Sequence, residues 1–168
     1  MTIKNTPLFL QEAFQEALRA SDPSNILPMG LKVAFKESPN GRCLILGAGK
    51  AAASMAAALE GYAAKHWPSI ELEGMVITRY GHSLPTTCIK VVEAAHPVPD
   101  EAGMRAAQET LQLIRTLKPG DHLIALVSGG GSSLLTLPAE GLGIEDVRAT
   151  TQALLRSGAP IGQMNVVR

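Results

Sequence analysis

Two glycine-rich turns contain the residues of this chain that are best suited to binding a phosphate. The first, Gly47-Ala48-Gly49-Lys50, follows the apolar run Cys43–Leu46 and precedes an alanine-rich segment. A strand, a tight glycine turn and a helix start, in that order, direct backbone N–H groups and the positive end of a helix dipole to one place. Glycines let a ligand approach the backbone closely. Because Lys50 adds a full positive charge, we predict that this turn binds an anion.

The second turn is Ser128-Gly129-Gly130-Gly131-Ser132-Ser133, which follows the apolar run from His122 to Val127. Consecutive glycines can direct several N–H groups toward one phosphate, and the serine hydroxyls add further donors. If both apolar runs are parallel strands, the two turns can face one crevice at the carboxyl edge of a sheet, where α/β proteins bind ligands. The structural alternatives are a packing turn for the first stretch and a flexible linker for the second.

Two familiar catalytic motifs do not fit these turns. A Walker A loop would need glycine where Leu44 stands and Ser or Thr where Ala51 stands. A serine-hydrolase elbow would need glycine at position 134, which is leucine. The phosphate-binding hypothesis therefore depends on the glycines, the serines and Lys50 themselves.

A nicotinamide-dependent reductase is a further hypothesis. Gly47, Gly49 and Ala52 fit the G-x-G-x-x-G/A dinucleotide pattern in its usual strand–turn–helix context. No Asp or Glu lies between Gly74 and Glu93 to hold the ribose hydroxyls, which counts against NAD. Arg79, at the end of the second expected strand, could instead accept a 2′-phosphate.

Two histidines, His82 and His96, lie in expected loops and are candidates to reach the crevice, although each can equally be a plain loop residue. The spacing of the candidate ligands is not that of a metal site, so we predict no protein-held metal. Asp100 is explained as a helix cap and is assigned no chemistry.

Composition narrows the class of protein. The chain has 168 residues, which suits one domain, with 46% hydrophobic residues and 15 basic against 15 acidic residues. A formal net charge of zero without a basic block makes nucleic acid an unexpected partner. We see no signal peptide and no apolar run near 20 residues, so we expect a cytoplasmic protein that does not cross a membrane.

Alternating strand and helix patterns predict an α/β fold, a three-layer α/β/α sandwich that is Rossmann-like with a mostly parallel sheet. Strands are expected at 43–46, 75–78, 89–94 and 122–127. Helices are expected to start at Thr6 and to span 23–35, 50–65, 101–118 and 144–157. The apolar residues expected to face the core are, in the first helix, Phe9, Leu10, Phe14, Ala17 and Leu18 and, in the 101–118 helix, Met104, Ala107, Leu111, Ile114 and Leu117.

The connection between the second and third strands is about ten residues long. A parallel crossover between neighbouring strands usually needs a dozen or more residues. We therefore expect the third strand to be antiparallel to the second, or to lie elsewhere in the sheet. The apolar end, 161–167, is expected to be a docking edge or a disordered tail.

Together, six stretches make the chain resemble the amino-terminal region of the class II glycerate kinases, the glycerate 2-kinase family also named hydroxypyruvate reductase. The stretches occur in this order: Gly47-Ala-Gly-Lys50-Ala, Thr78-Arg79-Tyr-Gly81-His82, Ala95-His96-Pro-Val-Pro-Asp100, Ser128-Gly-Gly-Gly-Ser-Ser133, Ser157-Gly-Ala-Pro-Ile161 and Asn165-Val-Val-Arg168. The resemblance covers essentially the whole chain, residues 1–168. Family proteins are more than twice as long and carry a second domain that this chain lacks.

The resemblance implies ATP-dependent phosphorylation of D-glycerate to 2-phosphoglycerate in a cleft between two domains. It makes Lys50 the catalytic cation, and implies ATP with Mg²⁺ shared by its phosphates. The nucleotide and phosphate site would comprise Gly47, Gly49, Ser128, Gly129, Gly130, Gly131, Ser132 and Ser133. Arg79, His82 and His96 become candidates to orient glycerate or the nucleotide. The expected partner is the small-molecule substrate, and a homodimer is an open prediction.

Two alternatives stay open beside the kinase. One is an NAD(P)H-dependent hydroxypyruvate reductase, which the missing ribose carboxylate disfavours. The other is a non-catalytic nucleotide-binding module, which this chain could be even if its longer relatives are kinases.

Overall fold

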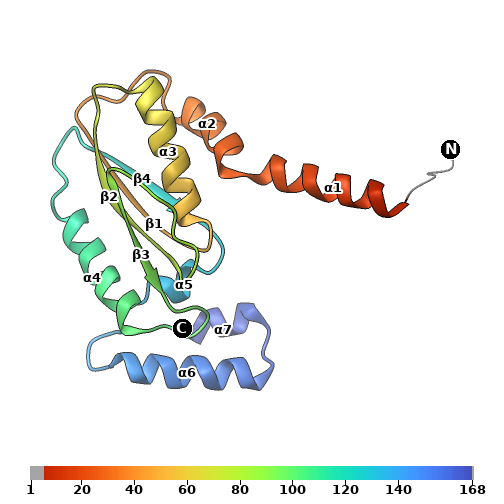
Figure 1. Ribbon diagram of the computed structural model, residues 1–168. Coiled ribbons are helices and arrows are strands. Elements are labelled where there is room, and N and C mark those ends of the chain that lie inside the picture. Colours follow the sequence, from red (N-terminus) through yellow and green to blue (C-terminus); the bar gives the residue numbers. More distant parts are fainter. Residues whose placement is uncertain (1–5, 168) are drawn as a thin grey trace.

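A four-stranded parallel sheet forms the centre of the computed structural model, which describes residues 6–167 (Figure 1). The strands are β1 (Arg42–Ala48), β2 (Glu71–Arg79), β3 (Ile89–Ala94) and β4 (His122–Val127). They lie in the order β3-β2-β1-β4, and each neighbouring pair is parallel. The expected α/β fold with a parallel sheet is confirmed. β2 begins four residues earlier than expected, because 71–74 already pair with β1.

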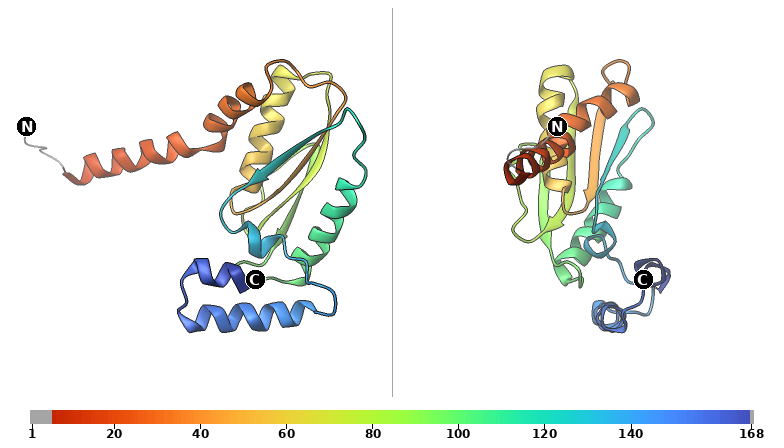
Figure 2. Two further views of the ribbon diagram at one scale, coloured as in Figure 1. Left: turned by 180° about the vertical axis from the view of Figure 1, so that it is seen from behind. Right: turned by 90° about the vertical axis from the view of Figure 1, so that its right-hand side faces the viewer.

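Helices cover both faces of this sheet (Figure 2). α3 packs on one face, with α2 against it, and α4 and α5 pack on the other. The helices are α1 (Thr6–Ser21), α2 (Pro23–Ala34), α3 (Ala52–His66), α4 (Glu101–Ile114), α5 (Gly131–Leu134), α6 (Ile144–Ser157) and α7 (Ile161–Val167).

Alternation along the strands divides the core into two halves. Cys43 and Ile45 of β1 pack beneath α3, where Ala52 and Ala56 leave room for the helix to lie close to the strands. Ala48, Met75, Ile77 and Leu134 belong to the second half, together with α4. Burial of this apolar surface provides the main driving force for folding, at about 25 cal/mol per Å².

β3 is parallel to β2 and directly beside it, so the expectation that β3 is antiparallel or placed elsewhere was wrong. The register explains how so short a connection suffices. β3 pairs only with Gly74–Arg79, the last six of the nine residues of β2, so the chain returns along about five residues, or roughly 17 Å. The nine residues 80–88 can span that distance without a helix.

The same connection is fixed at both ends by carboxylates. The Glu60 carboxylate of α3 accepts hydrogen bonds from the N–H groups of Thr87, Cys88 and Ile89, each at 2.7 Å. At the other end, Glu93 of β3 accepts from the N–H groups of residues 82 and 83, both at 3.1 Å. These bonds replace the packing that a crossover helix would normally provide.

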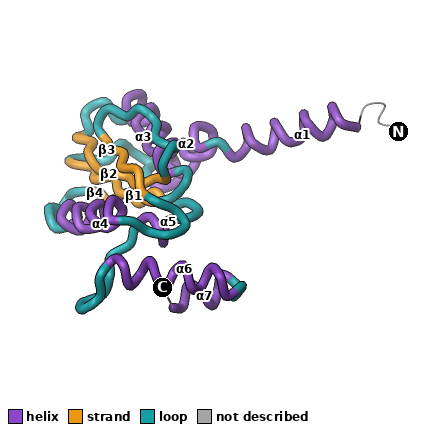
Figure 3. Tube along the Cα trace, turned by 60° about the horizontal axis from the view of Figure 1, so that its bottom comes forward, coloured by secondary structure: helices purple, strands orange, loops and turns teal. Residues whose placement is uncertain are grey.

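Two helices bury less apolar surface than their sequence periodicity indicated. α1 projects away from the sheet and has no buried residue, so Phe9, Leu10, Phe14 and Leu18 are exposed (Figure 3). α4 ends at Ile114 and not at Lys118, and it buries Gly103, Ala106, Ala107 and Thr110. Of the five residues expected on its core face only Ala107 is buried, because the small residues of its first half allow α4 to approach the sheet closely.

The α4 layer does not extend over β4, the edge strand of the sheet. Leu123 and Val127 of β4 point to the α4 side and are 47% and 72% exposed. They line an open apolar groove of about 550 Å³, together with Leu46 and Ile114 and the start of α5. The sandwich therefore has three layers over β1–β3, but only two over β4.

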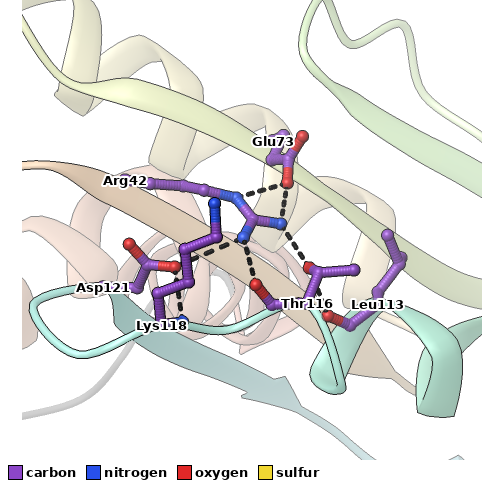
Figure 4. Close-up of polar contacts among 6 residues, drawn as sticks. All are labelled: Arg42, Glu73, Leu113, Thr116, Lys118 and Asp121. Atoms are coloured by element: carbon purple, nitrogen blue, oxygen red, sulfur yellow. Dashed lines mark hydrogen bonds and ion pairs between the residues drawn. The ribbon is translucent and has the colours of Figure 1, made fainter.

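An ion network closes the amino-terminal end of the sheet (Figure 4). The Arg42 guanidinium at the start of β1 donates to Glu73 of β2 at 2.6 Å and lies 3.3 Å from Asp121. It also donates to the carbonyl and hydroxyl oxygens of Thr116, just after α4, at 3.2 and 2.7 Å. The Glu73 carboxylate raises the pKa of Arg42, so the guanidinium stays charged.

The carboxyl-terminal helices lie beyond the carboxyl ends of the strands (Figures 1 and 3). α6 is capped by Asp146, whose carboxylate accepts from the Gly143 N–H at 2.8 Å, and it matches the expected range. Residues 161–167 form α7, so the expected alternative of a disordered tail was wrong, and a docking edge there stays a prediction. Arg168, the last residue of the Asn165–Arg168 motif, lies outside the described residues.

Candidate functional site

The predicted site residues gather at one edge of the sheet because all four strands are parallel. β1, β2, β3 and β4 end at Ala48, Arg79, Ala94 and Val127. The segments that follow these ends contain Lys50, His82, His96 and the 128–133 turn. Parallel topology thus brings to one edge groups that are far apart in the sequence; the sequence predicted this for the two glycine turns, but not for His96, because β3 was not expected to be parallel to β2.

The two glycine turns contact each other directly. The Lys50 N–H donates to the Gly129 carbonyl at 2.9 Å, and the Ala51 N–H donates to Ser128 Oγ at 3.0 Å. The Gly49 N–H donates to the Ile77 carbonyl at 3.0 Å. These N–H groups therefore already have partners within the protein. An anion at this edge must be bound by other donors.

The first turn uses glycine because the neighbouring strand and turn approach closely. A Cβ at Gly47 would collide with the Leu126 carbonyl of β4, and one at Gly49 with the Ser128 hydroxyl. Gly49 also has a positive φ of 144°. Both glycines thus have a packing role, which was one of the alternatives for this turn, and their contact with a phosphate stays a prediction.

The second turn separates its groups into inward-facing and outward-facing ones. Ser133 is buried, and its hydroxyl donates to the Gly130 carbonyl at 3.1 Å, while Ser128 Oγ accepts from Ala51. Gly129 and Ser132 are exposed. Among residues 6–167, no acceptor is found for the N–H groups of Gly129, Gly130 and Ser132. These three N–H groups, with the Ser132 hydroxyl, are the donors that the turn can offer to a ligand.

The side chain of Lys50 lies against this turn, as the sequence predicted. A Cβ built on Gly130 would lie 3.4 Å from Lys50 Cε. The same Cβ would lie 2.6 Å from His96 Nε2, so the imidazole reaches the turn as well. Thr78 positions the Lys50 backbone, since its buried hydroxyl donates to the Lys50 carbonyl at 3.4 Å. Thr78 has no distinctive sequence signal and was missed as a site residue.

The other two orienting candidates are exposed residues of the β2–β3 connection. Arg79 ends β2, and His82 follows three residues later, its N–H bonded to Glu93. Within residues 6–167, neither side chain is hydrogen-bonded to the 128–133 turn, so their role toward a substrate stays a prediction.

Tyr80 connects this segment to α4. Its hydroxyl donates to Asp100 Oδ2 at 2.7 Å, while Asp100 Oδ1 caps α4 by accepting from the Gly103 N–H at 3.0 Å. The bond to Asp100 raises the pKa of Tyr80. Burial works against the charged form of Asp100, but the hydrogen bonds from Gly103 and Tyr80 outweigh it and lower the pKa of Asp100. Asp100 is thus a helix cap, as predicted, and also holds Tyr80.

The apolar groove along β4 adjoins the second turn. Its lining includes Gly130, Gly131 and Ser132 next to Ala125, Val127 and Leu135. A ligand phosphate at the turn would therefore have an apolar surface on one side and the Lys50 and His96 side chains on the other. Within residues 6–167, no group of three or more His, Cys, Asp or Glu side chains could hold a metal ion. In the same part of the chain, no helix is long and apolar enough to span a bilayer.

The sequence of this chain is similar to those of several curated proteins. A "Putative hydroxypyruvate reductase" from Agrobacterium vitis is 45% identical over 159 residues, covering 95% of this chain and 34% of that protein. A "Glycerate 2-kinase" from Pyrococcus horikoshii is 37% identical over 162 residues, covering 91% of this chain and 35% of that protein. The chain thus spans about a third of the length of these curated relatives.

A crystal structure of glycerate kinase from Thermotoga maritima superposes with a TM-score of 0.77 at 36% identity, covering 94% of this chain and 36% of that one. Residues 9–168 match the family described as "Domain of unknown function (DUF4147)". By this match, and by relatives and a solved structure named as glycerate kinases, the chain belongs to the DUF4147 family.

Proposed function

We propose that this chain is the amino-terminal, phosphate-binding part of a glycerate 2-kinase, which transfers a phosphoryl group from ATP to D-glycerate and forms 2-phosphoglycerate. The observation that carries the proposal is the contact between Lys50 and the Gly130 turn. A lysine that follows β1 meets unpartnered N–H groups that follow β4. The names of the relatives supply the substrate class.

The chemistry required of the protein in this reaction is mainly positioning and charge stabilisation. Phosphoryl transfer proceeds with little covalent participation by the enzyme, while negative charge develops on the phosphoryl oxygens. Lys50 would place its ammonium at the transferring phosphate, and Gly129, Gly130 and Ser132 would donate N–H groups to neighbouring oxygens. Mg²⁺ would be held by the phosphates of ATP and would neutralise part of their charge.

The proposal includes a second domain. The relatives are about three times as long as this chain, and a cleft that closes over the nucleotide needs an opposite wall. Without that wall the phosphates stay solvated and each contact is weakened by the high dielectric constant of water. We therefore expect the isolated 168-residue chain to fold and to bind ATP weakly, but to phosphorylate glycerate poorly or not at all. A cytoplasmic location and a homodimer stay predictions from the sequence.

One pair of assays separates the kinase from the reductase. The longer protein that contains this chain is incubated with ATP, Mg²⁺ and D-glycerate, and separately with NADH or NADPH and hydroxypyruvate. We expect formation of phosphoglycerate in the first mixture and no oxidation of the nicotinamide cofactor in the second. The opposite result would favour the reductase named among the relatives. Nucleotide binding with neither reaction would favour a non-catalytic module.

Lys50→Met tests the site itself. The substitution keeps the length of the side chain but removes its charge, so turnover should fall by about 10²-fold or more. Lys65→Met is the matched control, since Lys65 is an exposed lysine in the last turn of α3. Near-normal turnover of a folded Lys50→Met protein would remove Lys50 from the mechanism.

A further inference from the structure

The side chains of Lys50 and His96 occupy the space that a side chain at position 130 would need. A Cβ on Gly130 would lie 2.6 Å from His96 Nε2, 2.8 Å from His96 Cδ2 and 3.4 Å from Lys50 Cε. Contacts below 3.0 Å cannot be accommodated without a shift of the imidazole. Gly130 also has φ of 89°, a left-handed conformation that disfavours any other residue. Glycine at this position thus permits the left-handed conformation of the turn and leaves space for the side chains of Lys50 and His96.

His96 reaches this point from the opposite edge of the sheet. It follows β3, whereas the 128–133 turn follows β4, and β2 and β1 lie between these two strands. The segment that carries His96 across contains Pro97 and Pro99, and Pro99 is fully buried. Two prolines restrict the backbone on either side of Val98. A stiff, anchored segment therefore holds the imidazole against the turn.

The arrangement differs sharply for the other loop histidine. His82 is exposed, and its backbone N–H is bonded to Glu93. Of the two histidine candidates at this edge, only His96 lies, together with Lys50, next to the position that a Cβ of residue 130 would occupy. His96 Nε2 and Lys50 Cε thus lie close to one point beside Gly130, in a turn whose residue 129 and 130 N–H groups have no acceptor among the described residues.

We propose that His96 is the second side chain that binds the phosphate held by this turn. Its Nε2–H would donate to a phosphate oxygen beside the Lys50 ammonium, and Gly130 would permit both groups to bind the same anion. This inference rests on the proposed function, because it assigns a further binding residue to the same site. It also ranks His96 above Arg79 and His82 as a residue that contacts the phosphate.

The test uses tripolyphosphate, which presents the linked phosphates of a nucleotide without its base. Calorimetric titration of the chain compares the wild type with His96→Ala, His96→Asn and Lys50→Met, with His66→Ala as the matched control, because His66 is an exposed histidine in the last turn of α3, at the end of the helix that lies away from the turn. Each His96 variant loses one hydrogen bond from the imidazole to phosphate. We expect both variants to bind tripolyphosphate about tenfold more weakly than the wild type. His66→Ala should bind as the wild type does. Circular dichroism and thermal unfolding confirm that each variant is folded.

A second substitution asks whether Gly130 acts through His96. Gly130→Ala should weaken binding, because the new methyl group displaces the imidazole. The double variant with His96→Ala should then bind no more weakly than Gly130→Ala alone. Such non-additivity marks two residues that act on one contact. Fully additive losses would show that Gly130 affects the turn independently of His96.

Nuclear magnetic resonance supplies a signature that a purely structural histidine would not give. Tripolyphosphate should shift the His96 imidazole nitrogen signals at saturation and leave those of His82 unchanged. If His96→Ala binds within twofold of the wild type while Lys50→Met has lost binding, the phosphate site stands and this inference is wrong. If Lys50→Met also binds normally, the proposed site itself fails.

Discussion

Glu60→Gln should destabilise the protein although Glu60 lies outside the candidate site. Its carboxylate accepts three backbone N–H groups, two at Oε1 and one at Oε2, all at 2.7 Å. A glutamine amide keeps one oxygen, and its NH₂ group would face a backbone donor on the other side. At least one hydrogen bond is lost, and the remaining ones are made to a neutral amide oxygen and no longer to a charged carboxylate. Since hydrogen bonds to charged groups contribute about 1.5–3 kcal/mol each, we expect a loss of about 2–4 kcal/mol.

Urea unfolding followed by circular dichroism measures this loss. The matched control is Glu109→Gln, because Glu109 forms an exposed ion pair with Lys90 and should contribute less than about 1 kcal/mol. Hydrogen exchange then locates the effect: the amides of residues 87–89 should lose protection first. A Glu60→Gln protein within about 0.5 kcal/mol of the wild type, with unchanged exchange at these amides, would refute the idea that this carboxylate fixes β3 beside β2.

Three further substitutions test the fold. Arg42→Met should lower the melting temperature by about 5 °C, as it leaves Glu73 and Asp121 without their shared partner; an unchanged melting temperature would argue that the network is dispensable. Gly74→Ala should cost about 3 kcal/mol or more, because its Cβ would collide with the Ile45 carbonyl, whereas Gly61→Ala, with open space in a helix, should be neutral or stabilising; equal effects would contradict the packing. Asp100→Asn should destabilise more at pH 7 than at pH 3. The lowered pKa means that the ionised cap stabilises the fold above about pH 4 and loses this contribution as the pH falls further; a pH-independent difference would refute the charge effect.

Local sequence signals predicted most of the elements. β3 and α6 have the expected bounds, and the Asp100 cap lies where the sequence placed it. Long-range placement was less predictable. The rule that a parallel neighbour needs a long crossover assumes strands that pair over their full length, and β3 pairs with only the last six of the nine residues of β2. The Glu60 bonds that support this arrangement join residues 27–29 positions apart and leave no periodic signal.

Hydrophobic periodicity located helices better than it located their buried faces. α1 is amphipathic, yet Phe14 and Leu10 are exposed, because the described residues pack nothing against that face. In α4, Ile114 lines the groove along β4 and Leu111 is exposed, while Gly103 and Ala106 are buried against the rest of the domain. Side-chain size rather than hydrophobicity decided which face approaches the sheet.

At the site, residue types predicted the gathering of groups but not their orientation. The lysine and the serine-glycine turn were expected to meet, and Lys50 Cε lies close to Gly130. No sequence signal indicated that the hydroxyl of Ser133 points inward or that the N–H of Gly49 is bonded to Ile77. Those orientations depend on hydrogen bonds between segments that become neighbours only after folding.

The ion network at Arg42 lies at the amino ends of the strands, whereas the glycine turns lie at their carboxyl ends. The seven residues of β1 separate these two regions by about 20 Å, a distance at which a unit charge contributes only about 0.2–0.8 kcal/mol for an effective dielectric constant between 80 and 20. A charge change at the amino end therefore shifts the folding equilibrium more than it changes the potential felt by a bound anion. Thermal tolerance and ligand affinity can thus evolve separately in this domain, since a substitution that tunes one leaves the other nearly unchanged.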